Sequence, residues 1–138
     1  LSIGNGDNLL EIARKYKVET PLLVTPDTRT DRLSEITDKA TGFLYLVARP
    51  GTTGAKNQLN GITTRAIRFI NTRVNRNIPV CVGFGLSTPE QIAEVIKAGA
   101  NGAIVGSAIV DKIESGHKPE EIEKFVSKLK EGTRLQSG

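Results

Sequence analysis

Methionine and tryptophan are absent from this chain of 138 residues, and cysteine and histidine each occur only once. Without any methionine, the chain cannot begin at its own unprocessed start codon, so we expect a partial or processed product. The single cysteine, Cys81, excludes an internal disulfide and fits a reducing compartment. Aromatic residues make up only 4% of the chain, so leucine, isoleucine, valine and alanine are expected to form the core.

Long apolar runs are also missing. No run approaches the roughly 20 residues that a membrane-spanning helix needs, and no signal peptide is visible. The net charge of +4 is modest, and lysines and arginines are expected to spread along helical faces among the acids. No basic block carries interleaved aromatics, so a nucleic-acid partner is not expected.

The length allows one domain, residues 1–138, with a frayed tail over residues 133–138. It does not allow a complete eight-fold β/α barrel, which takes about 250 residues. Strands are expected over residues 22–25, 43–47, 78–82 and 102–105, and helices over residues 9–17, 30–39, 62–74, 89–98, 107–114 and from 119 onward. The first helix is expected to bury a stripe made of Leu9, Ile12, Ala13 and Tyr16, and the second helix a stripe made of Leu33, Ile36 and Ala40. Residues 88–91 (TPEQ) form a strong signal for a helix start, and Gly99 suits the position just after the end of the same helix.

Three glycine-bearing turns each follow a short apolar run and cover residues 49–54, 83–85 and 106–107. Glycine lets a backbone N–H approach an anion closely and tolerates positive φ. Each turn leads into a helical segment, so free N–H groups and the positive ends of helix dipoles should point at one place. The pattern predicts part of a parallel β/α barrel with a phosphate site at its C-terminal face.

The strands are short and hydrophobic throughout, as expected for a parallel sheet that is buried on both faces. In such a sheet Cys81 would be a small core hydrophobe and not a nucleophile. An open doubly wound sheet is the alternative architecture. It is disfavoured because no GxGxxG follows the first strand, and the glycines come after the last three strands instead.

Three segments together resemble the C-terminal half of the tryptophan synthase alpha subunit family, whose fold is the TIM (β/α)8 barrel. They are the loop-like stretch 47–55 (VARPGTTGA), the strand and turn 82–91 (VGFGLSTPEQ) and the strand and turn 102–110 (GAIVGSAIV). The resemblance runs from about residue 9 to about residue 129. It implies strands five to eight of that barrel, here about four βα units.

By this resemblance the parent protein is a cytoplasmic lyase that cleaves indole-3-glycerol phosphate to indole and glyceraldehyde 3-phosphate in tryptophan biosynthesis. The resemblance implies that the phosphate is held by Gly54, Gly83, Gly85, Gly106 and Ser107. It implies that Tyr45 borders the indole-glycerol part, that Thr53 bonds to a catalytic aspartate and that Arg49 helps to fix the same loop. The alpha chain itself needs no cofactor, and its partner is a beta subunit that carries pyridoxal phosphate.

The family cleaves its substrate with a glutamate and an aspartate on early strands, and nothing here matches that segment. Among the acids of this chain, only Asp27 is expected at the C-terminal end of a strand. General acid–base work on a carbon–carbon bond needs titrating groups aimed into the site. We therefore expect no catalytic residue in this chain, a phosphate-binding half-site, and no activity from the chain alone.

Simpler roles remain open for each of these residues. The glycines would then only form tight turns, Ser107 would cap its helix, and Tyr45 would pack in the barrel wall. Arg49 would form a surface ion pair, and Asp27 would stabilise a turn through an Asx-type bond. His117 is expected to be solvated in a polar connection.

Two other functions also remain open at this stage. One is a non-catalytic half-barrel that binds phosphorylated metabolites and dimerises through its open edges. The other is a different phosphate-binding barrel enzyme of the phosphoribosyl-anthranilate or thiamine-phosphate type.

Overall fold

Four short parallel strands form one sheet in the order β1-β2-β3-β4, so each strand pairs with the next one along the chain. The computed structural model describes residues 6–49, 61–74 and 77–134. The strands are β1 (Leu22–Val24), β2 (Leu44–Val47), β3 (Val80–Gly83) and β4 (Gly102–Ile104). The helices are α1 (Asp7–Lys15), α2 (Thr30–Lys39), α3 (Gly61–Arg73), α4 (Pro89–Lys97), α5 (Ser107–Glu114) and α6 (Pro119–Gly132). The predicted elements are thus all present, with ends shifted by a few residues.

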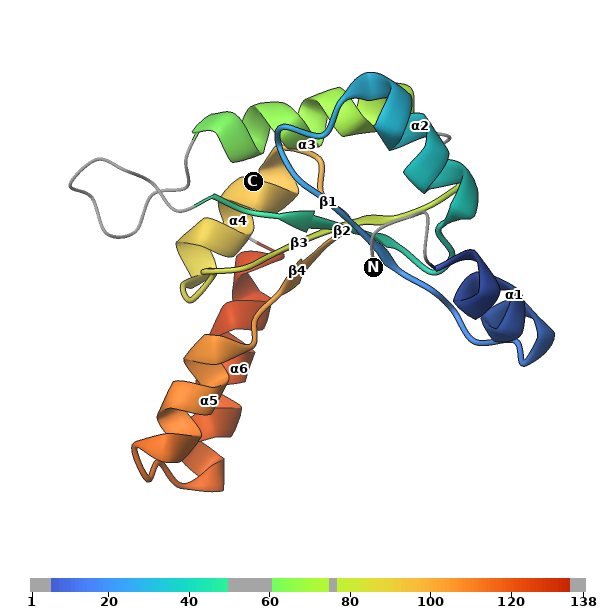
Figure 1. The fold of residues 1–138 in the computed structure, drawn as a ribbon. Coiled ribbons are helices and arrows are strands. Elements are labelled where there is room, and N and C mark those ends of the chain that lie inside the picture. Colours follow the sequence, from blue (N-terminus) through green and yellow to red (C-terminus); the bar gives the residue numbers. More distant parts are fainter. Residues whose placement is uncertain (1–5, 50–60, 75–76, 135–138) are drawn as a thin grey trace.

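A helix lies between each pair of consecutive strands, as in repeated βα units (Figure 1). All three strand pairings are parallel. A doubly wound sheet reverses its strand order at a switch point and covers both faces with helices. This sheet does neither, since its order runs in one direction and only one of its faces is buried. The half-barrel prediction is therefore the one that the strand order supports.

Burial alternates along β1 and β2, and the prediction that the sheet is buried on both faces is wrong. On β2, Leu44 and Leu46 are fully buried, whereas Tyr45 between them is only half-buried. On β1, Leu22 and Val24 are buried, whereas Leu23 is 52% exposed. Successive side chains of a strand point to opposite faces. One face of the sheet thus packs against the helices, and the other lies open.

Cys81 lies on this open face, in register with Tyr45 on the neighbouring strand. It is half-buried and its thiol is free, so the prediction that it is a core residue is wrong. A Cβ added to Gly102 would lie 3.1 Å from the Cys81 sulfur, so the glycine leaves room for the thiol. Burial raises the pKa of the Cys81 thiol, which keeps it protonated at neutral pH.

Helix α2 buries most of the stripe that its spacing predicts, but α1 does not. On α2, Leu33 and Ile36 are buried as expected. On α1 the buried residues are Leu10 and Ala13, while the predicted Leu9, Ile12 and Tyr16 are exposed by 45%, 46% and 69%. The apolar residues of α1 have helical spacing, as predicted. Only Leu10 and Ala13 pack against the rest of the described chain, and the other apolar side chains of the helix stay exposed.

The ends of α4 follow the sequence signals closely. The Thr88 hydroxyl accepts the Gln91 N–H, and the Gln91 side chain accepts from the Thr88 N–H, which is a capping box. Gly99 follows the C-cap with φ +111°, as predicted for the residue after a helix. The C-terminal end of α6 packs against the start of α4. Gly132 is buried, and a Cβ on it would overlap the backbone of Pro89.

Candidate functional site

Three strand ends and the turns that follow them meet at one edge of the sheet. Because the strands are parallel and in register, the C-terminal ends of β2, β3 and β4 are neighbours. The described site residues at this edge are Arg49, Gly83, Gly85, Gly106 and Ser107. Thr53 and Gly54 lie outside the described residues, so their roles stay predictions.

Gly83, at the end of β3, is glycine for a packing reason. A Cβ at this position would overlap the Tyr45 hydroxyl and would lie 2.7 Å from Tyr45 Cζ and 3.0 Å from Ile104 Cβ. These three residues share the open face of the sheet, since Val47, Gly83 and Ile104 are in register and Tyr45 is two positions before Val47. Tyr45 therefore reaches across the face toward the turn, close to where a ligand at the strand ends would sit.

Gly85 is glycine for a conformational reason. Its φ is +76°, a region that side chains disfavour, and no atom lies within 4 Å of an added Cβ. The preceding Phe84 also has positive φ, 78°, and its side chain is 65% exposed. A large aromatic in that conformation is uncommon, and such strain concentrates at binding sites. Sequence patterns alone did not single out Phe84, although an apolar aromatic between two glycines was a usable signal.

Gly106 has neither of these reasons to be glycine. Its φ is −123° and its ψ is −72°, so it lies outside the left-handed region that favours glycine, and no atom lies within 4 Å of an added Cβ. It is the N-cap of α5, and Ser107 is the first helical residue, so the prediction that Ser107 is the N-cap is wrong. The N–H groups of a first helical turn have no partner within the helix.

Helices α4 and α5, which both begin at this edge, differ in how the backbone N–H groups of their first turns are bonded. The start of α4 is closed by the capping box of Thr88 and Gln91. The start of α5 has no side-chain cap, and Gly106 and Ser107 are both exposed. Helix N-termini with free N–H groups attract anions. At this edge, the start of α5 is thus better prepared to accept an anion than the start of α4.

An ion pair joins the ends of β1 and β2. The Arg49 guanidinium pairs with the Asp27 carboxylate across the two strands, which agrees with the interpretation of Arg49 as an ion-pair residue. The hydrogen bonds recorded for the turn around Asp27 differ from the expected Asx-type bond of the Asp27 side chain. There, Thr28 N–H donates to Thr25 O and Thr25 N–H donates to the Thr28 hydroxyl.

The backbone of Arg49 is also held. Its N–H donates to the hydroxyl of Thr63, at 3.0 Å, and Thr63 is fully buried in the first turn of α3. A buried hydroxyl needs a partner, and here the bond joins the end of β2 to the start of α3. Sequence periodicity could not identify this role, because a threonine inside an apolar stripe looks like an ordinary small residue.

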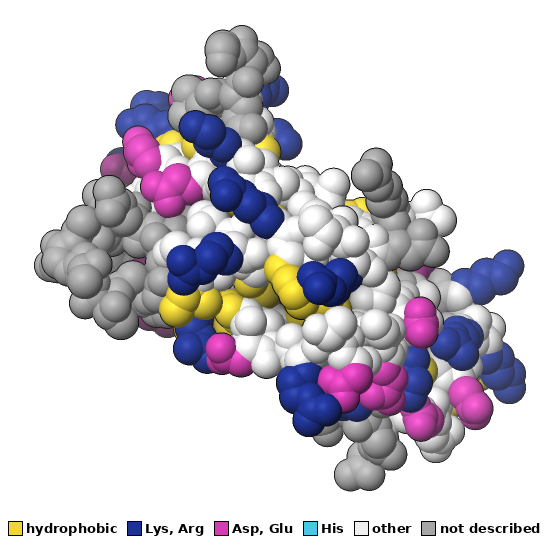
Figure 2. Space-filling view, turned by 90° about the horizontal axis from the view of Figure 1, so that it is seen from above, with side chains coloured by type: hydrophobic (Ala, Val, Ile, Leu, Met, Phe, Trp, Pro, Cys, Tyr) yellow, Lys and Arg dark blue, Asp and Glu magenta, His cyan; other side chains and the backbone are white. Residues whose placement is uncertain are grey.

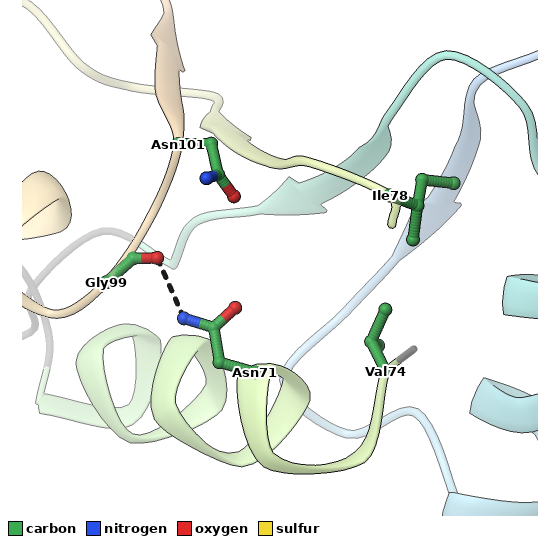
Figure 3. A pocket seen from close by; sticks show the side chains of 5 residues that line it. All are labelled: Asn71, Val74, Ile78, Gly99 and Asn101. Carbon is green, nitrogen blue, oxygen red and sulfur yellow. Dashed lines mark hydrogen bonds between the residues drawn. The ribbon is translucent and has the colours of Figure 1, made fainter. Parts of the chain in front are cut away.

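A different hollow lies at the opposite ends of β3 and β4 and has a volume of about 290 Å³. Two amides that line it already have structural partners. Asn71 donates to the Gly99 carbonyl at 2.7 Å (Figure 3). The Asn101 side chain accepts the Val80 N–H at 2.9 Å. These bonds close the end of α4 and the start of β3, so both amides serve the fold and neither needs a ligand.

His117 is exposed, as expected, with its Nδ1 near the Lys112 carbonyl. Among residues 6–49, 61–74 and 77–134, no group of three His, Cys, Asp or Glu side chains is arranged to hold a metal ion. The same part of the chain contains no helix that is long and apolar enough to cross a membrane.

Comparison with known proteins gives one family. The model of the tryptophan synthase alpha chain family matches residues 3–137. The tryptophan synthase alpha chain of Methanopyrus kandleri is 37% identical over 131 residues, which are 95% of this chain and 46% of that protein. The alpha chain of Methanosarcina mazei is 48% identical over 111 residues, which are 80% of this chain and 40% of that protein. This chain therefore spans about half of the length of the curated relatives that it matches.

Solved structures agree with this result. A chain of the tryptophan synthase α2β2 complex of Pyrococcus furiosus superposes with a TM-score of 0.83 at 36% identity. The match covers 94% of this chain and 52% of that one. The tryptophan synthase A-subunit of the same organism gives a TM-score of 0.81 at 34% identity. The four-stranded parallel sheet is thus a fragment of a TIM barrel, as predicted.

Proposed function

Because this chain belongs to the tryptophan synthase alpha chain family, we propose that it carries the phosphate-binding half of the site for indole-3-glycerol phosphate. The observation that carries the proposal is Gly106, which has neither the positive φ that explains Gly85 nor the close neighbours that explain Gly83. A ligand that needs close approach to the backbone supplies the missing reason.

The phosphate would be bound by the first N–H groups of α5, with the Ser107 hydroxyl beside them. The absence of a side-chain cap on α5 supports this arrangement. Backbone N–H groups of the turn that holds Gly83 and Gly85 would complete the cradle, as successive amides do in anion-binding turns. Gly54 would add a further N–H, and this part of the proposal rests on the family resemblance alone.

The rest of the substrate would extend over the open face of the sheet. Tyr45 is half-buried there and reaches toward Gly83, which suits a residue that borders the indole-glycerol part. Arg49 is fixed by Asp27 and Thr63 at the lip of the site and would hold the segment that begins there. Thr53 would bond to the catalytic aspartate, and this role also rests on resemblance.

Cleavage to indole and glyceraldehyde 3-phosphate would require acids from another half of the protein. The open sheet face supports this division of labour, since four strands leave the interior of the barrel uncovered. A second half would supply the glutamate and aspartate, and this chain alone would be inactive. We further propose a cytoplasmic location, no cofactor on this chain, and a beta subunit with pyridoxal phosphate as the partner of the whole protein.

The test is an amide NMR titration of the 138-residue chain with indole-3-glycerol phosphate and, separately, with inorganic phosphate. We expect the signals of Gly83, Gly85 and Gly106 to shift together and to saturate. Gly106→Ala should fold normally and bind about tenfold more weakly, a loss of about 1.4 kcal/mol, because the added Cβ keeps the phosphate away from the backbone N–H groups. The matched control is Gly61→Ala, where an added Cβ also meets no atom within 4 Å.

Stationary glycine signals in a well-dispersed spectrum would refute the phosphate site. Equal weakening by Gly106→Ala and Gly61→Ala would refute the specific role of Gly106. Movement with indole-3-glycerol phosphate but not with inorganic phosphate would place the binding energy in the indole part, against the proposal.

A second candidate is a non-catalytic half-barrel that dimerises, and the exposed Leu23 on the open face favours it. Two copies could pair β1 with β4 twice and close an eight-stranded barrel. Sedimentation equilibrium distinguishes the two candidates. A well-folded monomer at micromolar concentration would exclude the dimer, whereas a dimer would support it.

A further inference from the structure

Helix α3 carries a charge pattern that differs from the rest of the chain. Between Asp38 and Glu90 the sequence has seven lysines and arginines and no acid, so the expected even mixture of charges is wrong here. On α3 itself the charged residues are Arg65, Arg68 and Arg73, all exposed, and the helix has no lysine.

These arginines have no acidic partner in the part of the chain that the structure describes. The ion pairs recorded there involve other cations. Arg73 lies instead over the ring of Phe69, 3.9 Å from its centre. Arg65 and Arg68 are three positions apart, where like charges repel on a helix. Arg73 lies in the last turn of α3, where a cation favours the helix dipole. Arg65 and Arg68 therefore do not serve the stability of α3.

A hollow of about 270 Å³ lies beside the basic face of this helix. Arg65 and Phe69 line it from α3, and Pro26 and Thr28 line it from the turn after β1. Phe69 remains 37% exposed. Asp27 also borders the hollow, but its carboxylate is paired with Arg49. Arg65 is therefore the charged side chain at this hollow that remains available to bind another molecule.

Basic and apolar side chains lie next to one another on this side of the molecule. Figure 2 looks onto it from above, the side on which Figure 1 shows α2 and α3, and dark blue Lys and Arg side chains flank yellow hydrophobic ones, with magenta Asp and Glu side chains also on this face. Protein interfaces are enriched in arginine and aromatic residues and depleted of lysine, aspartate and glutamate. The outer face of α3 has this composition.

We propose that the outer face of α3 is a docking surface for a protein segment that presents carboxylates on both sides of an apolar side chain. The apolar side chain fills the hollow against Phe69, and the carboxylates pair with Arg65, Arg68 and Arg73. Arginine suits this task because its planar guanidinium binds carboxylates with two parallel hydrogen bonds. The surface lies apart from Gly106 and Ser107, so the inference does not rest on the proposed function.

The test measures the fluorescence anisotropy of a short labelled peptide of alternating glutamate and leucine in the presence of the whole chain. We expect saturable binding that Arg65→Glu with Arg68→Glu weakens by about tenfold or more, the loss typical of central interface residues. The matched control is Lys124→Glu with Lys128→Glu on α6, which changes the net charge equally. Phe69→Ser should also weaken binding, while Gly106→Ala should leave it unchanged.

Arg68→Gln provides a milder variant, and circular dichroism verifies that each variant is folded. Equal weakening by the α3 and α6 pairs would show an effect of net charge alone and would overturn the proposal. Tighter binding of a single-stranded oligonucleotide than of the peptide would also overturn it, in favour of a nucleic-acid surface. Absence of saturable peptide binding would overturn it outright.

Discussion

The hydroxyl end of Tyr45 occupies the space in which a side chain on Gly83 would have to lie. The two residues belong to neighbouring strands, so the size of one limits the size of the other. Gly83 is therefore explained by packing before any ligand is considered. This separates it from Gly106, for which the free protein gives no such reason.

Gly83→Ala should lower the free energy of unfolding by about 1–3 kcal/mol, the usual cost of overpacking. The measurement is urea unfolding followed by circular dichroism. In a Tyr45→Ala background the same change should cost much less, because the hydroxyl and ring are gone. Strictly additive effects of the two substitutions would contradict the contact.

Alkylation of Cys81 should require a higher pH in the folded chain than in a short peptide. Burial raises the pKa of the thiol, and the thiolate is the reactive species. The measurement is the rate of reaction with iodoacetamide as a function of pH, with the urea-unfolded chain as control. A folded profile that coincides with the unfolded one would contradict the burial.

The raised pKa of Cys81 also makes stability depend on pH. The thiol is protonated more tightly in the folded state, so the unfolded state ionises first as pH rises. The contribution of Cys81 to stability is therefore fully present below its ordinary pKa, and it is lost as pH rises toward the folded pKa. Cys81→Ser should remove this pH dependence from urea unfolding measured across the alkaline range.

Loss of the Lys39 side chain should loosen α1. Lys39 bonds to Asp7 at 3.0 Å, and this hydrogen bond, with the charges of Asp7 and Glu35, raises the pKa of Lys39. A raised lysine pKa gives stability that is present below the ordinary value and is lost as pH rises through the folded value. Lys39→Ala should speed amide hydrogen exchange in α1, whereas Lys124→Ala on α6 should not. Unchanged exchange in both variants would show that Leu10 and Ala13 alone hold the helix.

The sequence predicted those features that depend on local chemistry. The capping box of Thr88 and Gln91, the turn at Gly99 and the order of the strands all follow from residue types at fixed spacing. The burial of Leu23 and Cys81 was predicted wrongly, because hydrophobicity shows only that a residue prefers to be covered. Whether other residues cover such a side chain depends on which elements of the fold are present, and these four strands leave one sheet face open. Leu9 and Ile12 of α1 are likewise exposed because no other described element packs over them.

In the candidate site, too, the sequence could predict some features and could not predict others. Gly85 and Gly106 could be selected from the sequence because a glycine directly after a buried strand is typical of a turn that brings the backbone close to an anion. The partners of Arg49 could not, since Asp27 and Thr63 are 22 and 14 residues away in the chain and meet it only in the folded sheet. Family resemblance supplied the phosphate, and the structure separates Gly106 from the glycines that packing or conformation already requires.

The strand order also bears on how the chain folds. Each strand pairs only with its predecessor and its successor in the sequence, so every ladder closes a loop no longer than one βα unit. Short loops cost little entropy to close, and mainly local pairings favour rapid folding. A nascent chain could therefore add one unit at a time as it leaves the ribosome. The long-range step of barrel formation would be postponed until β1 and β4 acquire neighbours of their own.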